Sequence, residues 1–196
     1  MSKEYRKGEK VFKKVYPILM VFYYPLVILP RFFSEILWEL SRGIPGHVGI
    51  GLRYVLLKRL AKECGTNVSV LPSVHFHIGK NLVVGSHISI REHTYIDGDN
   101  LEIGDNVMIS HGTSIITGAH VYDKVLPMRD TLEDRPVTIG NNVWLGAGAK
   151  IIGETTIGDN VIIGANSVVI KPIPSNVVAS GNPAIIIKKL EGNPNT

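Results

Sequence analysis

Cysteine is nearly absent from this sequence. Its 196 residues contain one, Cys64, which excludes an intramolecular disulfide and is typical of a reducing compartment. We expect Cys64 to be a small buried residue near a helix end and not a catalytic thiol. The chain also has no GxGxxG sequence and no Walker-type loop, so a phosphate-bearing ligand would be held by dispersed contacts.

The net charge is small and comes from one end of the chain. The formal charge is +4, and residues 1–14 hold six basic and two acidic residues, so the remainder is balanced. This balance argues against a broad nucleic-acid-binding surface, and no nucleic-acid-binding motif is present. We therefore expect no nucleic-acid partner.

A six-residue period runs from about Val68 to Ile187. Each block opens with an aliphatic residue, a small residue often follows, and two polar or small residues come next. The clearest blocks begin at Val84, Ile103, Ile109, Ile139, Leu145, Ile157 and Ile163. A single block cannot bury its own apolar residue, so stacked blocks must share a continuous core.

The composition of the block predicts a parallel β-helix. A strand of about three residues points its aliphatic side chain inward. Gly-Asp-Asn and Gly-Asn-Asn form tight turns, because glycine and asparagine accept a positive φ. Three blocks per coil would close a flat-sided prism that has no room for helices. The period does not determine the handedness of the coil, and a β-sandwich would have no reason to keep it.

These blocks resemble the hexapeptide-repeat acyltransferases. The most similar stretches are Pro136–Ala149, Ile163–Val169 and Ala179–Ala184, and the resemblance covers about the last two thirds of the chain. It implies an all-β dominated fold, a left-handed parallel β-helix with an N-terminal helical segment and one extruded loop. Tyr95–Gly98 and Asn100–Ser114 resemble the branch that acetylates capsular and other cell-surface polysaccharides.

Three segments are expected along the chain. Residues 1–65 form a basic and apolar helical segment, residues 66–187 form the catalytic β-helix with a loop at 121–136, and residues 188–196 form a tail. In the first segment, helical spacing predicts helices over Arg31–Ser41 and Leu52–Lys62, separated by Gly43-Ile-Pro-Gly46. Arg53 is expected on the polar side of the second helix.

The apolar run Val15–Leu29 has fifteen residues and contains Pro17 and Pro25, so it is shorter than the roughly 20 residues of a bilayer span. No small-residue cleavage site follows, which argues against a signal peptide. Three interpretations stay open. An interfacial membrane anchor through residues 1–41 fits the composition best, and the alternatives are a helical cap on the β-helix and a true span.

An anchor would place the basic head on the cytoplasmic leaflet. We therefore expect a cytoplasmic protein that is peripheral on the inner face of the cell membrane, where it would meet lipid-linked sugars.

One interruption of the period follows His120. Val121–Arg135 has no six-residue rhythm, and the period resumes at Val137. Long insertions in repeat proteins are surface loops that commonly serve a site. The resembled family keeps its catalytic histidine at this position, which implies that His120 is the catalytic base.

A neutral imidazole can take the proton of a sugar hydroxyl as that hydroxyl attacks a thioester, an effect worth about 10²–10⁴ in rate. A carboxylate would orient the second ring nitrogen of His120, and a backbone N–H of Gly146 or Ala147 would stabilise the oxyanion. The loop offers four carboxylates, Asp123, Asp130, Glu133 and Asp134. Of these we favour Asp123.

The candidates for acceptor binding are Arg91, Glu92, His93 and His111. Related acetyltransferases often carry asparagines near the first three, so the acceptor contacts stay open. His75 and His77 share one side of a strand, as a metal pair would. A catalytic zinc site needs three ligands and an open position, and we expect no metal.

The resemblance implies acetyl-CoA as co-substrate, held along small-residue turns and by cations that suit its phosphates. The matching positions are Trp144, Gly146, Ala147, Ala165, Asn166, Lys171, Asn182, Pro183 and Lys188. The family forms homotrimers with active sites at the subunit interfaces, and closed cyclic symmetry is usual for such assemblies.

The sequence thus predicts an acetyl-CoA-dependent O-acetyltransferase that modifies a sugar hydroxyl of a cell-surface polysaccharide or its precursor. The acceptor would be a sugar, a nucleotide-sugar or a lipid-linked saccharide. An aminosugar N-acetyltransferase, a zinc enzyme like the gamma-class carbonic anhydrases and a non-catalytic β-helical scaffold are the alternatives.

Overall fold

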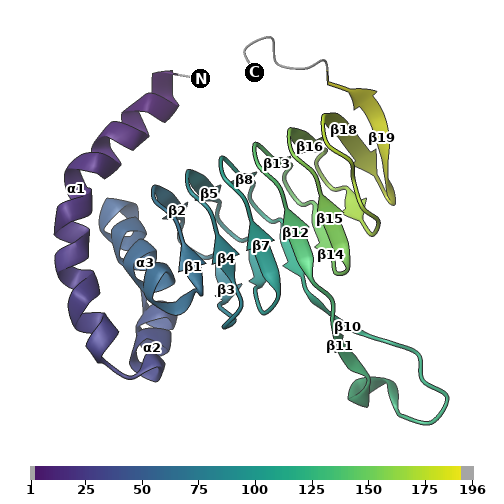
Figure 1. The fold of residues 1–196 in the computed structure, drawn as a ribbon, viewed down its shortest axis with the longest axis horizontal. Coiled ribbons are helices and arrows are strands. Elements are labelled where there is room, and N and C mark those ends of the chain that lie inside the picture. Colours follow the sequence, from purple (N-terminus) through teal and green to yellow (C-terminus); the bar gives the residue numbers. More distant parts are fainter. Residues whose placement is uncertain (1–2, 191–196) are drawn as a thin grey trace.

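A computed structural model describes residues 3–190, with side chains from Glu9 onward. Its main body is a triangular prism made of three parallel sheets, which we call A, B and C (Figure 1). The chain visits the sheets in turn through five complete coils and enters a partial sixth. This is the left-handed parallel β-helix that the resemblance implies.

Sheet A contains β1 (Glu63–Cys64), β4 (Val83–Val84), β7 (Leu101–Ile103), β12 (Val137–Ile139) and β15 (Thr155–Ile157). Sheet B contains β2 (Val68–Val70), β5 (Ile88–Ile90), β8 (Met108–Ile109), β13 (Trp144–Leu145), β16 (Val161–Ile163), β18 (Val177–Gly181) and the antiparallel β19 (Ala184–Lys189). Sheet C contains β3 (His75–His77), β6 (Tyr95–Asp97), β9 (Ser114–Ile116), β14 (Lys150–Ile152) and β17 (Val168–Val169).

The core is a stack of equivalent aliphatic side chains. In sheet B the register places Ile90, Ile109, Leu145, Ile163 and Ala179 one above another, and all are fully buried. Side chains that alternate along these strands point out of the prism. Each coil therefore covers the apolar row of the next one.

The corner between sheets A and B shows why the period contains asparagine. Asn142, Asn160 and Asn176 take φ values of 54°, 56° and 61°, in the left-handed region. The Nδ2 of Asn142 donates to Asn160 Oδ1 at 2.8 Å, and the Nδ2 of Asn160 donates to Asn176 Oδ1 at 3.0 Å. Asparagine thus accepts the turn and also links successive coils.

Three helices precede the prism: α1 (Lys3–Ile28), α2 (Arg31–Ser41) and α3 (Gly46–Leu60). The predicted bounds of α2 are confirmed. The third helix begins six residues before the predicted Leu52, because its glycines weaken the helical pattern in the sequence. They serve close packing, since a Cβ at Gly51 would lie 2.9 Å from Leu19 Cδ2 of α1.

All but the last residue of the apolar run Val15–Leu29 lies in α1, and the interruption expected at its prolines is absent. Helix α1 continues through Pro17 and Pro25, both of which are exposed. By length and composition alone, its 20-residue stretch Glu9–Ile28 is apolar enough to cross a membrane, and 6% of this stretch is buried.

Helices α2 and α3 cover the open end of the first coil (Figure 1). Trp38 of α2 is buried, and its Nε1 donates to Phe76 O at 3.1 Å. Leu56, Leu57 and Leu60 of α3 join the same buried cluster as the strands. Helices α2 and α3 therefore form the cap that the open end of a β-helix needs.

Arg53 corrects the sequence analysis, which expected it on a polar surface. The side chain is fully buried, and burial lowers its pKa. Its Nε donates to Val70 O at 2.8 Å, and its Nη1 donates to Ser41 O and to Ile44 O. The guanidinium thus joins the first coil to the end of α2 and to the α2–α3 loop.

The two segment boundaries also differ slightly from those expected. Strand β1 begins at Glu63, inside the segment expected to be helical, and β19 ends at Lys189, inside the expected tail. Residues 191–196 of that tail lie outside the described residues.

We expect Arg53→Leu to lower the apparent free energy of unfolding by about 3 kcal/mol, because the carbonyls of Val70, Ser41 and Ile44 each lose a hydrogen bond from the guanidinium. Chemical denaturation measures this change. Arg129→Leu is the matched control, since its side chain is 86% exposed in the hairpin loop, and we expect it to unfold like the wild type. Equal midpoints for the two variants would contradict the role given to Arg53.

Candidate functional site

The corner between sheets B and C gathers most of the site residues predicted from the sequence. Its turns lie one above another, because Gly112 N donates to Glu92 O, Gly148 N to His111 O and Asn166 N to Ala147 O. The predicted residues in this column, which we call the B/C column, are Arg91, Glu92, His93, His111, Gly146, Ala147, Ala165 and Asn166. Acceptor and donor candidates that are far apart in sequence thus share one edge of the prism.

Small residues make this column smooth at its later coils. A Cβ at Gly146 would lie 2.6 Å from the backbone nitrogen of Ala165, so the turn has space for glycine alone. Ala165 and Asn166 are exposed next to it. A flexible, extended ligand could lie along such a surface and meet backbone N–H groups. By contrast, the first coils of the column carry polar side chains, among them the Arg91–Glu92 pair at 3.2 Å.

Three further donor candidates lie beside the column. Trp144 is on the outer side of sheet B, 45% exposed, and its Nε1 donates to Ser110 Oγ of the corner at 3.0 Å. The Asn182–Pro183 turn follows β18, where Gly181 N donates to Ser167 Oγ at 3.1 Å. Lys188 is in β19, paired with Val178 of sheet B.

His120 and Lys171 lie at the corner between sheets C and A, not at the B/C column. His120 is the last residue of β10 (Gly118–His120), which pairs with β11 (Leu132–Asp134) as an antiparallel hairpin. The hairpin projects from the prism, and its loop contains the short helix η1 (Met128–Asp130) (Figure 1). The insertion thus begins at Gly118, slightly before the loop expected from the sequence, and His120 is exposed at its base.

Asp123 supports the hairpin loop. Its Oδ1 accepts the backbone N–H of Val125 at 2.6 Å and that of Leu126 at 2.8 Å. These two bonds favour the carboxylate and lower the pKa of Asp123, with Leu126 the larger cause. Within residues 3–190, no hydrogen bond or ion pair joins Asp123 to His120, so an orienting role for Asp123 stays a prediction.

Asp97 is a site neighbour that the sequence analysis did not single out. It occupies the same corner as the hairpin, and a Cβ at Gly118 would lie 3.7 Å from Asp97 Oδ2. His77 and Asp99 are close by, with His77 Nε2 3.6 Å from Asp99 Oδ2. The coil register could have revealed this, because Tyr95–Asp97 is one coil before the strand that leads into the hairpin.

The two histidines considered as a metal pair have different neighbours. The ring of His75 stacks on Tyr95 with centroids 5.2 Å apart, whereas His77 approaches Asp99. The only group of three metal-ligating side chains found among residues 3–190 is His77, Asp97 and Asp99, and His77 and Asp99 are exposed. Exposed acidic groups of this kind are common without a metal.

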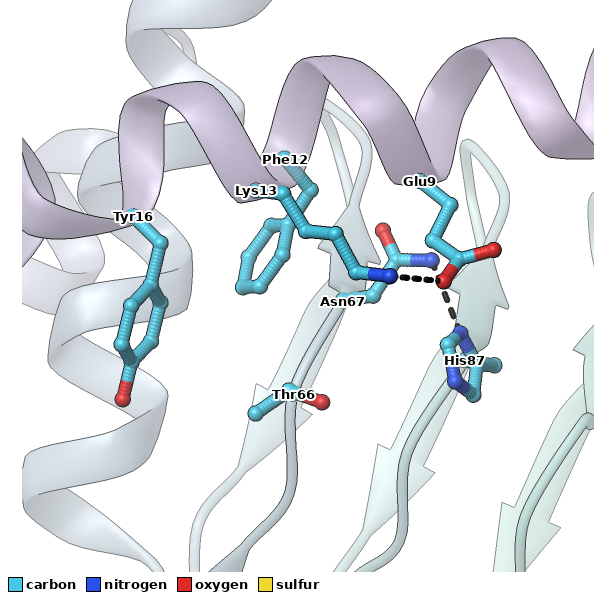
Figure 2. A pocket seen from close by; sticks show the side chains of 7 residues that line it. All are labelled: Glu9, Phe12, Lys13, Tyr16, Thr66, Asn67 and His87. Atoms are coloured by element: carbon cyan, nitrogen blue, oxygen red, sulfur yellow. Dashed lines mark hydrogen bonds and ion pairs between the residues drawn. The ribbon is translucent and has the colours of Figure 1, made fainter.

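A hollow lies elsewhere, between α1 and the corner of sheets A and B. Figure 2 shows Phe12 and Tyr16 of α1 on one side and Asn67 and His87 of the first coils on the other. Lys13 Nζ is 2.7 Å from Glu9 Oε1, and this interaction is the main cause of the lowered pKa of Glu9. This hollow is separate from both the B/C column and His120, so we do not assign the reaction to it.

Cys64 is the expected inert thiol. It is half-buried in β1, and burial raises its pKa to about 12. A thiol with such a pKa is protonated at neutral pH and is a poor nucleophile.

Comparisons with known proteins agree with the β-helical fold. Residues 136–171 match the family model described as bacterial transferase hexapeptide (six repeats). The chain is 35% identical over 158 residues to a galactoside O-acetyltransferase of Escherichia coli, covering 80% of this chain and 77% of that protein. It is 32% identical over 139 residues to WcaF of Escherichia coli, named as a candidate acetyltransferase of colanic acid biosynthesis, covering 70% and 74%.

Among solved structures, a hexapeptide-repeat acetyltransferase of Vibrio cholerae in complex with acetyl coenzyme A superposes with a TM-score of 0.73 at 27% identity. The match covers 83% of this chain and 87% of that one.

The lowered pKa of Asp123 predicts how pH acts on the hairpin loop. The carboxylate bonds stabilise the loop above the pKa that Asp123 has in the unfolded chain, and this stabilisation is lost as pH falls through the lower folded pKa. We expect the amide resonances of Val125 and Leu126 to shift together with a midpoint below 3.8, the ordinary value. NMR titration measures this, and the shared transition should vanish in Asp123→Asn.

Proposed function

We propose a specific reaction for this chain, which belongs to the bacterial hexapeptide-repeat transferase family and is an acetyl-CoA-dependent acetyltransferase. It moves the acetyl group to a hydroxyl of a sugar in a cell-surface polysaccharide or its precursor. The observation that carries the proposal is an exposed histidine, His120, at the base of the one insertion that leaves the prism.

The B/C column supports the donor assignment. Its glycine and alanine turns offer an even edge for the pantetheine arm, and Trp144 lies beside it. The turn at Asn182–Pro183 and the cation of Lys188 lie past the last coil, where they suit the nucleotide phosphates. Lys171 lies at another corner, so in a single chain it is less favourably placed for this ligand.

His120 supplies the base. A neutral ring nitrogen takes the proton of the attacking sugar hydroxyl, while the hydroxyl oxygen forms a bond to the thioester carbon. The tetrahedral oxyanion is then stabilised by a backbone N–H group. Ala147 is our candidate, because the N–H of Gly146 donates to Ile163 O at 2.8 Å inside the prism. When the carbon–sulfur bond breaks, the imidazolium returns the proton to the leaving thiolate, so the histidine is regenerated.

The separation of the two parts supports a site shared between chains. In one prism the donor column and His120 lie at different corners, with the width of sheet C between them. A cyclic homotrimer would bring the corner of one prism against the hairpin of its neighbour. Each active site would then take its base from one subunit and its donor column from the other.

The proposed class of acceptor, a sugar, is supported by the named functions of two relatives and by polar side chains in the first coils. The named functions of the two relatives reported above, a galactoside O-acetyltransferase and a colanic acid biosynthesis acetyltransferase, concern carbohydrates. Arg91, Glu92, His93 and His111 give the column charged and hydrogen-bonding groups, which suit sugar hydroxyls. Asp97, at the base of the hairpin, is a further candidate for an acceptor hydroxyl.

The first experiment compares His120→Ala with the wild type, using acetyl-CoA and a panel of free, nucleotide-linked and lipid-linked sugars. We expect kcat for thiol release to fall by about 10²–10⁴, because the general base is lost, while calorimetry finds an unchanged Kd for acetyl-CoA. His47→Ala is the control, since His47 is an exposed residue of α3. Full transfer activity in His120→Ala would remove the histidine from the mechanism.

Ala165→Trp tests the donor column. An indole on this exposed turn would occupy the path of the pantetheine arm, so we expect the Kd for acetyl-CoA to rise at least about tenfold, roughly 1.4 kcal/mol. Thr156→Trp places the same side chain on the exposed side of sheet A and should leave the Kd unchanged. Equal binding by both variants would place the donor elsewhere.

A further inference from the structure

The outer sides of α1 and α2 form an apolar surface, which we call the apolar face. Ile18, Val21, Phe22 and Ile28 of α1 and Ile36 and Leu40 of α2 are 53% to 87% exposed. They lie on two consecutive helices joined by Leu29 and Pro30. Several large apolar side chains exposed on each helix mark an interaction site.

Helix α2 is oriented opposite to the usual pattern of a surface helix. Ser34 and Ser41 are fully buried against the rest of the protein, together with Trp38, whereas the stripe that contains Ile36 and Leu40 faces outward. A soluble surface helix turns its apolar stripe to the core. The stripe of α2 therefore requires an apolar partner outside the chain.

The charge beside the apolar face indicates which partner this is. Lys10 and Lys14 are exposed on α1, next to the apolar residues, and residues 1–14 carry the whole net charge of the protein. An anionic lipid surface complements this charge, with about 1 kcal/mol for each basic residue near it. A second copy of the chain would bring the same positive charge.

We propose that α1 and α2 lie in the interfacial region of an anionic membrane, with the apolar face among the acyl chains and the lysines at the headgroups. The apolar face is at the end of the prism opposite β19 (Figure 1). The prism, the hairpin and the B/C column then extend into the water. In the proposed trimer of side-by-side prisms, all three apolar faces would lie in one plane.

An interfacial position fits the contacts of α1 better than a span does. Arg59 of α3 donates to Leu26 O and Leu29 O at the end of α1, and Phe12 packs edge-on against Tyr54 of α3 at 5.2 Å. A span would break these contacts. It would also bring charged groups near Glu9 into the bilayer, because the uncharged run Val15–Leu29 is about 22 Å long and the hydrocarbon core is about 30 Å thick.

Vesicle flotation of the full-length protein tests the proposal. We expect the wild type to bind phosphatidylcholine vesicles that contain about a third phosphatidylglycerol, and to bind pure phosphatidylcholine more weakly. Ile18→Glu combined with Phe22→Glu should lower the bound fraction at least about tenfold. Lys10→Gln combined with Lys14→Gln should remove most of the preference for the anionic vesicles, and it leaves the Lys13–Glu9 pair intact.

Ile187→Glu is the matched control, because Ile187 is 61% exposed at the other end of the prism; it should bind vesicles like the wild type. Unchanged thermal melting shows that the variants fold. Two results would overturn the proposal: a wild type that ignores both vesicle types, or a glutamate variant that still binds. If the wild type does not bind vesicles and the double glutamate variant has a lower oligomer mass than the wild type, the apolar face belongs instead to a contact with a second copy.

Resistance of the membrane-bound wild type to alkaline carbonate extraction would indicate a span.

Discussion

The vertical register of the coils is the constraint on which the rest of this structure depends. Every inward aliphatic residue must lie above its equivalent in the preceding coil, and every corner must turn at the same point. The left-handed φ values of Asn142, Asn160 and Asn176 meet the second requirement. A slip of one residue would turn the buried row outward along the whole face. The period is therefore conspicuous in the sequence, and it carries the prediction of the fold.

The same register explains what could be predicted of the site and what could not. Positions one coil apart fall at one corner, so Glu92, His111, Ala147 and Asn166 could be grouped from their places in the blocks. The relation of His120 to this group is different, since the hairpin leaves the prism and no period extends into it. Asp97 belongs to no motif of its own. It lies beside the hairpin only because β9, one coil later, leads into the hairpin, so the sequence alone does not single it out.

The N-terminal segment follows other rules, and the sequence predicted it less well. Prolines were read as interruptions, yet α1 continues through both of them on its exposed side. The helical spacing of Leu52–Lys62 predicts a polar surface for Arg53. In the structure it donates to three carbonyl oxygens at the junction of α2, α3 and the first coil. These carbonyl oxygens come together only when the three elements pack, so the periodicity of a single helix cannot predict that Arg53 is buried among them.

A regular prism has flat faces and offers no concave site of its own, which shapes how this chain performs chemistry. Chemistry has to be added at the corners, as small residues along one column and as an insertion at another. The proposed base and the proposed donor column lie on different edges, so side-by-side assembly is the simplest way to join them. If all prisms of such an assembly point the same way, their capped ends share one plane. An apolar surface at the capped end would then orient every active site at the same height above a membrane, within reach of acceptors anchored in it.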